Sequence, residues 1–160
     1  MYDQRIQDLV DNLGVKIKYS GKIEAGGTYI ASLNWIIINS NLREMDQYEV
    51  LLHELGHACQ HRDCFELYNT TLNNHLKCEC EADAFMIEEL VEKYMSVNNI
   101  DIEQINYVNF IVDNDLSTSY IPILKKILQS KIKRKGMYAL FHRPNTDDVK
   151  IRKRSGKLCD

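Results

Sequence analysis

The sequence lacks the long apolar run that a membrane-spanning helix needs, and its first residues, 1–5, lack the apolar centre of a secretory signal peptide. It also lacks a glycine-rich phosphate loop, a nucleophile elbow, internal repeats and low-complexity segments. The first two absences argue against a membrane or secreted protein and predict a cytoplasmic one. The others argue against phosphate-loop and serine-hydrolase chemistry and against a repeat architecture.

The cysteines do not form the even set that a disulfide framework would require. There are five, and no leader sequence precedes them: Cys59, Cys64, Cys78, Cys80 and Cys159. The C-x-x-x-x-C and C-x-C spacings are poor matches to the ligand pairs of structural zinc sites. We therefore expect free, partly buried thiols.

The composition is that of a soluble globular chain. With 160 residues, 44% hydrophobic and 27% charged, it suits one domain with its own core. The net charge of -3 is uneven, because residues 131–160 hold ten Lys or Arg against three Asp. Such an end could contact nucleic acid or an acidic partner, but we favour a solvated, partly disordered tail at 136–160.

One short stretch, His53-Glu54-Leu55-Gly56-His57, reads H-E-x-x-H within a helical pattern. Four residues turn a helix through about 400°, so the two imidazoles lie on one face, where one metal ion can take both. Glu54 lies about 100° round, where it can reach a water at the metal rather than the metal itself. Gly56 costs about 1 kcal/mol of helix propensity, which indicates either close approach of a strand or substrate, or a tight helix–helix contact.

A catalytic zinc usually takes three protein ligands, so a third is needed. Position 63 is Asp63, which excludes the histidine spacing of the metzincins. Glu79, in the first turns of a second helix, is favoured over Glu81. Asp83 lies one turn after Glu79 and could fix a histidine ring through its second nitrogen. We expect one Zn²⁺; manganese and iron are alternatives.

The remaining pattern predicts an α+β fold, mostly helical, with a small three-stranded sheet packed beside the metal-binding helix. Helix is expected over 2–13, strands near 15–19, 28–32 and 35–39 (the last central), and the metal helix from Asp46, with a capping box at Asp46–Glu49. Residues 62–76 read as loop, and a long helix follows over 77–95. Further helices begin near Asp101 and Ser117.

These motifs resemble the ImmA/IrrE family of zinc metallopeptidases. The resemblance rests on H-E-L-G-H-A-x-x-H, ending at His61, and on Glu79-Cys80-Glu81-Ala82-Asp83-Ala84-Phe85. It covers residues 1–95 and implies a zincin-like domain over 1–135, with 96–135 as additional helices. It implies His53, His57 and Glu79 as zinc ligands and Glu54 as catalytic acid/base. It further implies a protease, often carried by phages and mobile elements, that cleaves or disables a helix-turn-helix repressor.

Two functions of different kinds follow. The first is a zinc endopeptidase in which Glu54 takes a proton from the attacking water and gives it to the leaving amine. The oxyanion needs a further donor, for which His75, Tyr48 and His142 are candidates. The second is a non-proteolytic, zinc-stabilised regulator that binds a repressor or DNA. The intact Glu54 favours the first, because a structural site needs no acid/base.

Overall fold

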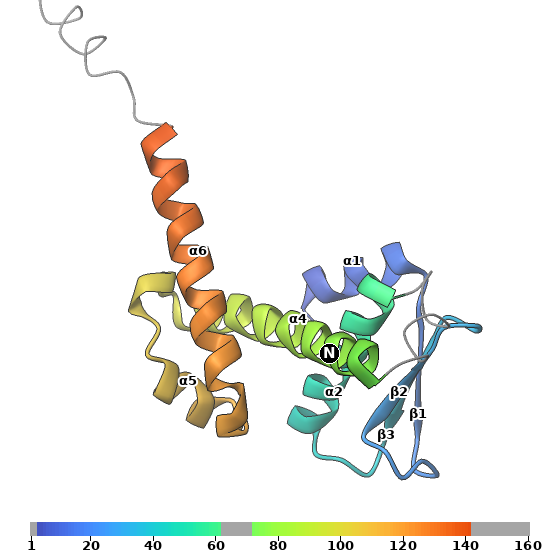
Figure 1. Ribbon diagram of the computed structural model, residues 1–160. Helices are drawn as coiled ribbons and strands as arrows, with labels where there is room; N and C mark the ends of the chain where they lie inside the picture. Colours follow the sequence, from blue (N-terminus) through green and yellow to red (C-terminus); the bar gives the residue numbers. More distant parts are fainter. Residues whose placement is uncertain (1–2, 62–71, 142–160) are drawn as a thin grey trace, which may run out of the picture.

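The computed structural model describes residues 3–61 and 72–141 (Figure 1). The chain begins with helix α1 (Gln4–Leu13), which is followed by strands β1 (Lys16–Ser20), β2 (Gly27–Ile30) and β3 (Trp35–Asn39). Helices α2 (Glu44–His61) and α4 (Leu72–Asn98) come next. The described chain ends with a 3₁₀ turn η1 (Ile102–Gln104), helix α5 (Tyr107–Asp113), a second turn η2 (Thr118–Tyr120) and helix α6 (Ile121–Phe141).

The three strands form a mixed sheet in the order β1-β3-β2. β3 pairs in parallel with β1 and antiparallel with β2, and it lies in the centre as its β-branched run predicts. Two isoleucines of this strand, Ile36 and Ile38, are fully buried and face the core. The prediction of an α+β fold, mostly helical with a small three-stranded sheet, is confirmed.

Helices α2 and α4 pack closely against each other, and α2 also lies on β2 and β3 (Figure 1). The core between them contains Leu51, Leu52 and Leu55 of α2, all fully buried. Gly56 is the point of closest approach. A Cβ atom at Gly56 would lie 2.9 Å from the Cα atom of Ala82 and 3.1 Å from its carbonyl oxygen. Of the two explanations for this glycine, the helix–helix contact is the correct one.

The C-terminal helices form a second layer over the far end of α4. Phe110 of α5 and Leu124 of α6 are fully buried, and Leu128 is nearly so. The side chain of Asn106 caps α5 by accepting bonds from the backbone N–H groups of residues 108 and 109. Asp101 and Gln104 form a capping box, which begins the 3₁₀ turn η1 where the sequence predicts the start of a helix.

The starts of helices α2 and α4 differ from the sequence prediction. α2 begins at Glu44, so Asp46 lies inside the helix, where it pairs with Arg43 instead of capping. The side chain of Gln47 donates to the carbonyl of Leu42, 2.7 Å away, which stabilises this earlier turn. α4 begins at Leu72, so residues 72–76 are helix and not loop. In a helix, Asn and His cost only about 0.7 kcal/mol per residue relative to alanine. Because this cost is small, the adjoining helix can extend through these residues. None of the described helices has the length and apolar character needed to cross a membrane.

Replacing Gly56 by alanine is expected to lower the free energy of unfolding by about 1–3 kcal/mol, because the new methyl group meets the backbone of Ala82 and forces α2 and α4 apart. Gly136 is the matched control, since a Cβ atom there meets nothing within 4 Å. Gly136→Ala should be neutral or stabilise by about 0.5–1 kcal/mol. Urea unfolding of both variants measures the difference. Equal stability of the Gly56 variant and the unmodified chain would contradict the contact.

Candidate metal centre

The two histidines of the H-E-x-x-H motif share one face of α2, as their spacing predicts. Their Nε2 atoms are 3.2 Å apart, and the rings meet edge to face at 79°. Both side chains are mostly buried, with exposed fractions of 21% for His53 and 14% for His57. Two nitrogens are thus directed at one point from a rigid helix.

Glu79 of α4 completes a three-residue cluster. Its Oε2 atom lies 3.4 Å from Nε2 of His53, and its Oε1 atom lies 3.6 Å from Nε2 of His57. Four-coordinate zinc with bonds of about 2.0–2.1 Å holds neighbouring ligand atoms about 3.3 Å apart. The observed separations are close to that value, and one ligand atom from each residue lies within 4.8 Å of the others. Two imidazoles and a carboxylate at these distances fit a tetrahedral metal ion with one position left open.

Glu81, the alternative to Glu79, is directed elsewhere. Its carboxylate lies 3.7 Å from Nζ of Lys77, one turn earlier on α4, and its carbonyl oxygen accepts a bond from Gln60. Glu81 is not part of the candidate metal cluster in the described part of the chain. The geometry therefore favours Glu79 as the third ligand.

Asp83 lies where the sequence places it, one turn after Glu79 and against the other side of a histidine ring. Its Oδ1 atom accepts a hydrogen bond from Nδ1 of His53, 3.0 Å away. This bond fixes the tautomer that leaves Nε2 free to bind a metal. Burial lowers the pKa of His53, but the bond to Asp83 and the negative charges of Glu54, Asp83 and Glu79 outweigh it, so the net shift is upward.

Replacing Asp83 by asparagine is expected to weaken metal binding about 10–100-fold, because the neutral amide supports the His53 ring and its tautomer less well. The change is nearly isosteric, so the fold should be retained. Zinc affinity is measured by competition with a chromogenic chelator. Asp11→Asn, at an exposed position on α1, is the control and should bind zinc as the unmodified chain does. Unchanged affinity in the Asp83 variant would show that the bond has no role in metal binding.

Glu54 is buried, with 9% of its surface exposed, and it is the only charged side chain in the buried class within the described residues. It lies between the cluster and strand β2, where the backbone of Tyr29 donates a hydrogen bond to it. Burial raises the pKa of Glu54, and the charge of Glu79 adds to the rise, while His53 and the Tyr29 bond lower it. Among the described residues no lysine or arginine forms an ion pair with Glu54. A buried carboxylate without such a partner is costly, which favours a role in proton transfer.

Gly27 lets strand β2 come this close to the motif. A Cβ atom at Gly27 would lie 2.4 Å from Cγ1 of Val50 and 3.4 Å from Cγ of Glu54. The sequence shows Gly26-Gly27 only as a turn signal. Its role in bringing an edge strand against the metal helix depends on tertiary packing and has no local signature.

The three candidate donors for an oxyanion are placed very differently. His75 lies on α4 one turn before Glu79, with its Nε2 atom 3.8 Å from Oε1 of that residue, and it is 56% exposed. Tyr48 lines a separate pocket. His142, like the side chain of His61, falls outside the described residues.

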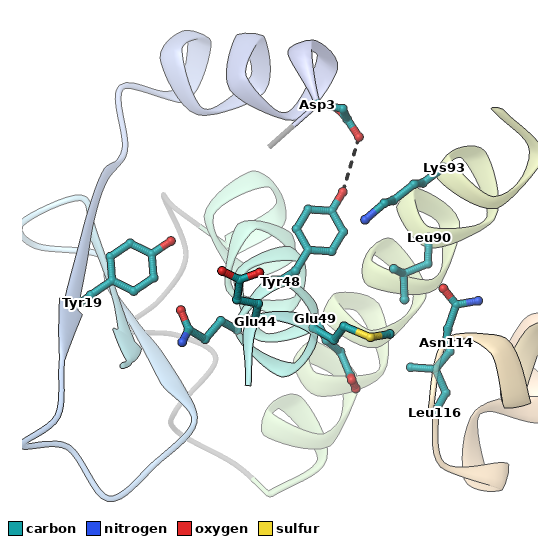
Figure 2. Close-up of a pocket in the computed structure, with 11 residues that line it drawn as sticks. Asp3, Tyr19, Glu44, Tyr48, Glu49, Leu90, Lys93, Asn114 and Leu116 are labelled. Atoms are coloured by element: carbon teal, nitrogen blue, oxygen red, sulfur yellow. Dashed lines mark hydrogen bonds between the residues drawn. The ribbon is translucent and has the colours of Figure 1, made fainter. Parts of the chain in front are cut away.

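The pocket that contains Tyr48 lies at the N-terminal end of α2 and has a volume of about 590 Å³ (Figure 2). The Tyr48 hydroxyl lies 3.4 Å from Oδ2 of Asp3, and the Lys93 ammonium lies 3.8 Å from the centre of the ring. None of His53, His57 and Glu79 lines this pocket, so it is not part of the metal centre.

Tyr120 is a neighbour of the site that sequence reasoning missed. Burial and the negative charges of Asp83 and Glu49 raise the pKa of this tyrosine to about 12. Glu49 lies one turn before His53 on α2, and burial raises its own pKa. The turn η2 thus brings the C-terminal layer close to the carboxylate that orients His53. Nothing in the local sequence around Tyr120 indicates this proximity.

The three cysteines in the described range, Cys59, Cys78 and Cys80, are free thiols. Cys78 is buried, but Cys59 and Cys80 are exposed, so the expected partial burial is wrong for those two. Cys64 and Cys159 fall outside the described residues.

A comparison with models of protein families gives a match. Residues 11–95 match the peptidase M78 family, described as the IrrE N-terminal-like domain. No match was found among curated proteins. The matched range includes the sheet, α2 and most of α4, and with them every residue of the cluster. The chain belongs to the peptidase M78 family, and its function is of the metallopeptidase type.

Proposed function

We propose that this chain is a zinc-dependent endopeptidase of the gluzincin type, with His53, His57 and Glu79 as ligands of one ion. The observation that carries the proposal is the position of Glu54, a buried carboxylate beside a three-ligand cluster. A purely structural zinc site is closed by four protein ligands and needs no acid. The cluster has three ligands among the described residues and an acid next to it.

Zinc bound there would polarise the peptide carbonyl and lower the pKa of the attacking water. Glu54 has the position and the raised pKa to accept the proton of that water and to deliver it to the leaving amine. Asp83 holds His53 in the tautomer that binds metal. The protein thus supplies ligands, orientation and a proton carrier.

Of the three candidate oxyanion donors we favour His75, because its Nε2 atom lies 3.8 Å from Oε1 of Glu79, whereas Tyr48 lines a separate pocket. Its exposure leaves it accessible to a substrate. If it has this role, His75→Ala should lower kcat without changing the zinc content. An unchanged kcat would exclude His75 as the oxyanion donor.

Strand β2 offers a binding edge for the substrate. It is the outer strand next to α2, and it pairs with β3 on one side only among the described strands. An extended peptide could pair with its outer edge by main-chain hydrogen bonds and so run past Glu54. A structure with a bound peptide and no strand pairing at residues 27–30 would exclude this mode.

The proposed substrate is a helix-turn-helix repressor of a phage or mobile element, and the proposed location is the cytoplasm. Incubation with the repressor encoded beside its gene tests both the substrate and the metal. We expect cleavage with zinc present and none after a chelator removes it, with activity restored when zinc is added back. Intact repressor in every tube, with zinc bound, would favour the second candidate, a regulator that binds without cutting.

A further inference from the structure

Helix α6 has no acidic residue along its whole length. Its 21 residues include six basic ones: Lys125, Lys126, Lys131, Lys133, Arg134 and Lys135. Residues 142–160 add six more Lys or Arg against three Asp. The chain therefore concentrates positive charge at one end, although its net charge is -3.

One side of α6 is neutralised by the rest of the molecule. Lys131 pairs with Glu92 of α4 at 2.7 Å, and Lys135 lies within 3.1 Å of both Asp101 and Glu103. These three acids lie on the side of α6 that faces α4 and η1. They therefore balance the two lysines on that side and leave the opposite side basic.

The opposite side carries Lys126 and Lys133, and Arg134 lies at the edge between the two sides, where it lines a cavity with Lys131 and Lys135. All three are exposed, and no ion pair or hydrogen bond joins them to another residue of the described ranges. Lys126 and Lys133 are seven residues apart, so they lie within about 20° on the helix and about 10 Å apart along its axis. Arg134 follows about 100° round. We call these three residues the outward face of α6; they carry three positive charges that form no ion pair within the described ranges, although Arg134 lies near Glu92 and Asp101.

The last turns of α6 extend clear of the rest of the described chain (Figure 1). Residues 132–137 are all exposed. A helix is about 10–12 Å across with its side chains, and the major groove of B-DNA is about 12 Å wide. The major groove of duplex RNA is too narrow for side chains to read. A protruding basic helix therefore fits duplex DNA better than duplex RNA.

We propose that the outward face of α6 binds duplex DNA through its phosphates. At 0.1 M salt, attraction between charges is screened beyond about 10 Å. DNA binding therefore depends more on the positive charge of this face than on the net charge of the whole chain. The surface goes beyond the proposed peptidase function, because it uses none of the metal cluster. Its consequence is to hold the peptidase on DNA, where a DNA-bound protein substrate would be found.

The test is fluorescence anisotropy of a short labelled DNA duplex with the full chain at about 50 mM salt. The triple variant Lys126→Gln, Lys133→Gln, Arg134→Gln is expected to bind DNA about tenfold more weakly or worse. The slope of log affinity against log salt concentration should become shallower by the equivalent of about three phosphate contacts. The matched control replaces Lys16, Lys18 and Lys22 by Gln, three exposed lysines at the opposite end of the chain. It removes the same charge and should bind DNA as the unmodified chain does.

Several results would overturn the proposal: no DNA binding at about 50 mM salt, equal loss of binding in the two triple variants, or no loss in the α6 variant. Tighter binding to duplex RNA, or to phosphatidylserine vesicles, than to DNA would also do so. Residues 142–160 are unchanged in both variants, so the comparison isolates α6. The result is independent of proteolysis, because a chain with Glu54→Gln should bind DNA normally.

Discussion

Replacing Glu54 by glutamine is expected to reduce cleavage about 10²–10⁴-fold while the metal centre keeps its ion. Glutamine has nearly the same shape, so it should fit the buried space beside β2 that Glu54 fills. It cannot accept the proton of water or return one to a leaving amine. The rate of repressor cleavage and the zinc content, measured on the same preparation, separate loss of chemistry from loss of metal.

The control for this variant is Glu49→Gln, one turn before His53 on the same helix. Glu49 is half-buried and burial raises its pKa too, but it is not part of the metal cluster. Most of the cleavage rate should survive in the Glu49 variant. A Glu54→Gln chain that still cleaves at the full rate would refute the mechanism. One that still relieves repression without cleaving would support the non-proteolytic regulator.

The clustering of the candidate ligands could be predicted in part because the spacing within each pair is local. His53 and His57 lie four residues apart on one helix, and Glu79 and Asp83 repeat that spacing on another. Helical periodicity alone places each pair on one face. The sequence cannot say that the two helices meet at Gly56, where the backbone of Ala82 comes within 2.9 Å of an added Cβ atom. That contact brings the two pairs together.

The features that the sequence did not predict arise from contacts between distant segments. Tyr120 reaches the neighbourhood of Asp83 only because the C-terminal layer folds back over α4. The close approach of Gly27 to Glu54 likewise depends on how β2 packs on α2. The earlier start of α2 depends partly on Arg43, whose guanidinium pairs with Asp46 and with the distant Asp115 at 2.9 Å. Local propensity contains no information about any of these pairs.

Replacing Glu79 by alanine is expected to remove the metal and with it all metal-dependent cleavage. Two histidines alone bind a divalent ion far more weakly than two histidines and a carboxylate, because one bond and one negative charge are lost. Glu81→Ala is the matched control. It removes the same group two residues along α4, but its carboxylate faces Lys77 and not the histidines.

The pair of variants decides between the two glutamates, since each loses one carboxylate from the same helix. We expect zinc to be absent from purified Glu79→Ala and present in Glu81→Ala at the level of the unmodified chain. With zinc present, Glu79→Ala should melt at a lower temperature than the unmodified chain, because zinc bound to the unmodified chain stabilises its folded state. With chelator present, the two chains should melt at similar temperatures. Zinc retained by Glu79→Ala and lost by Glu81→Ala would reassign the third ligand. Loss in both variants would mean that the acidic start of α4 acts through its charge as a whole.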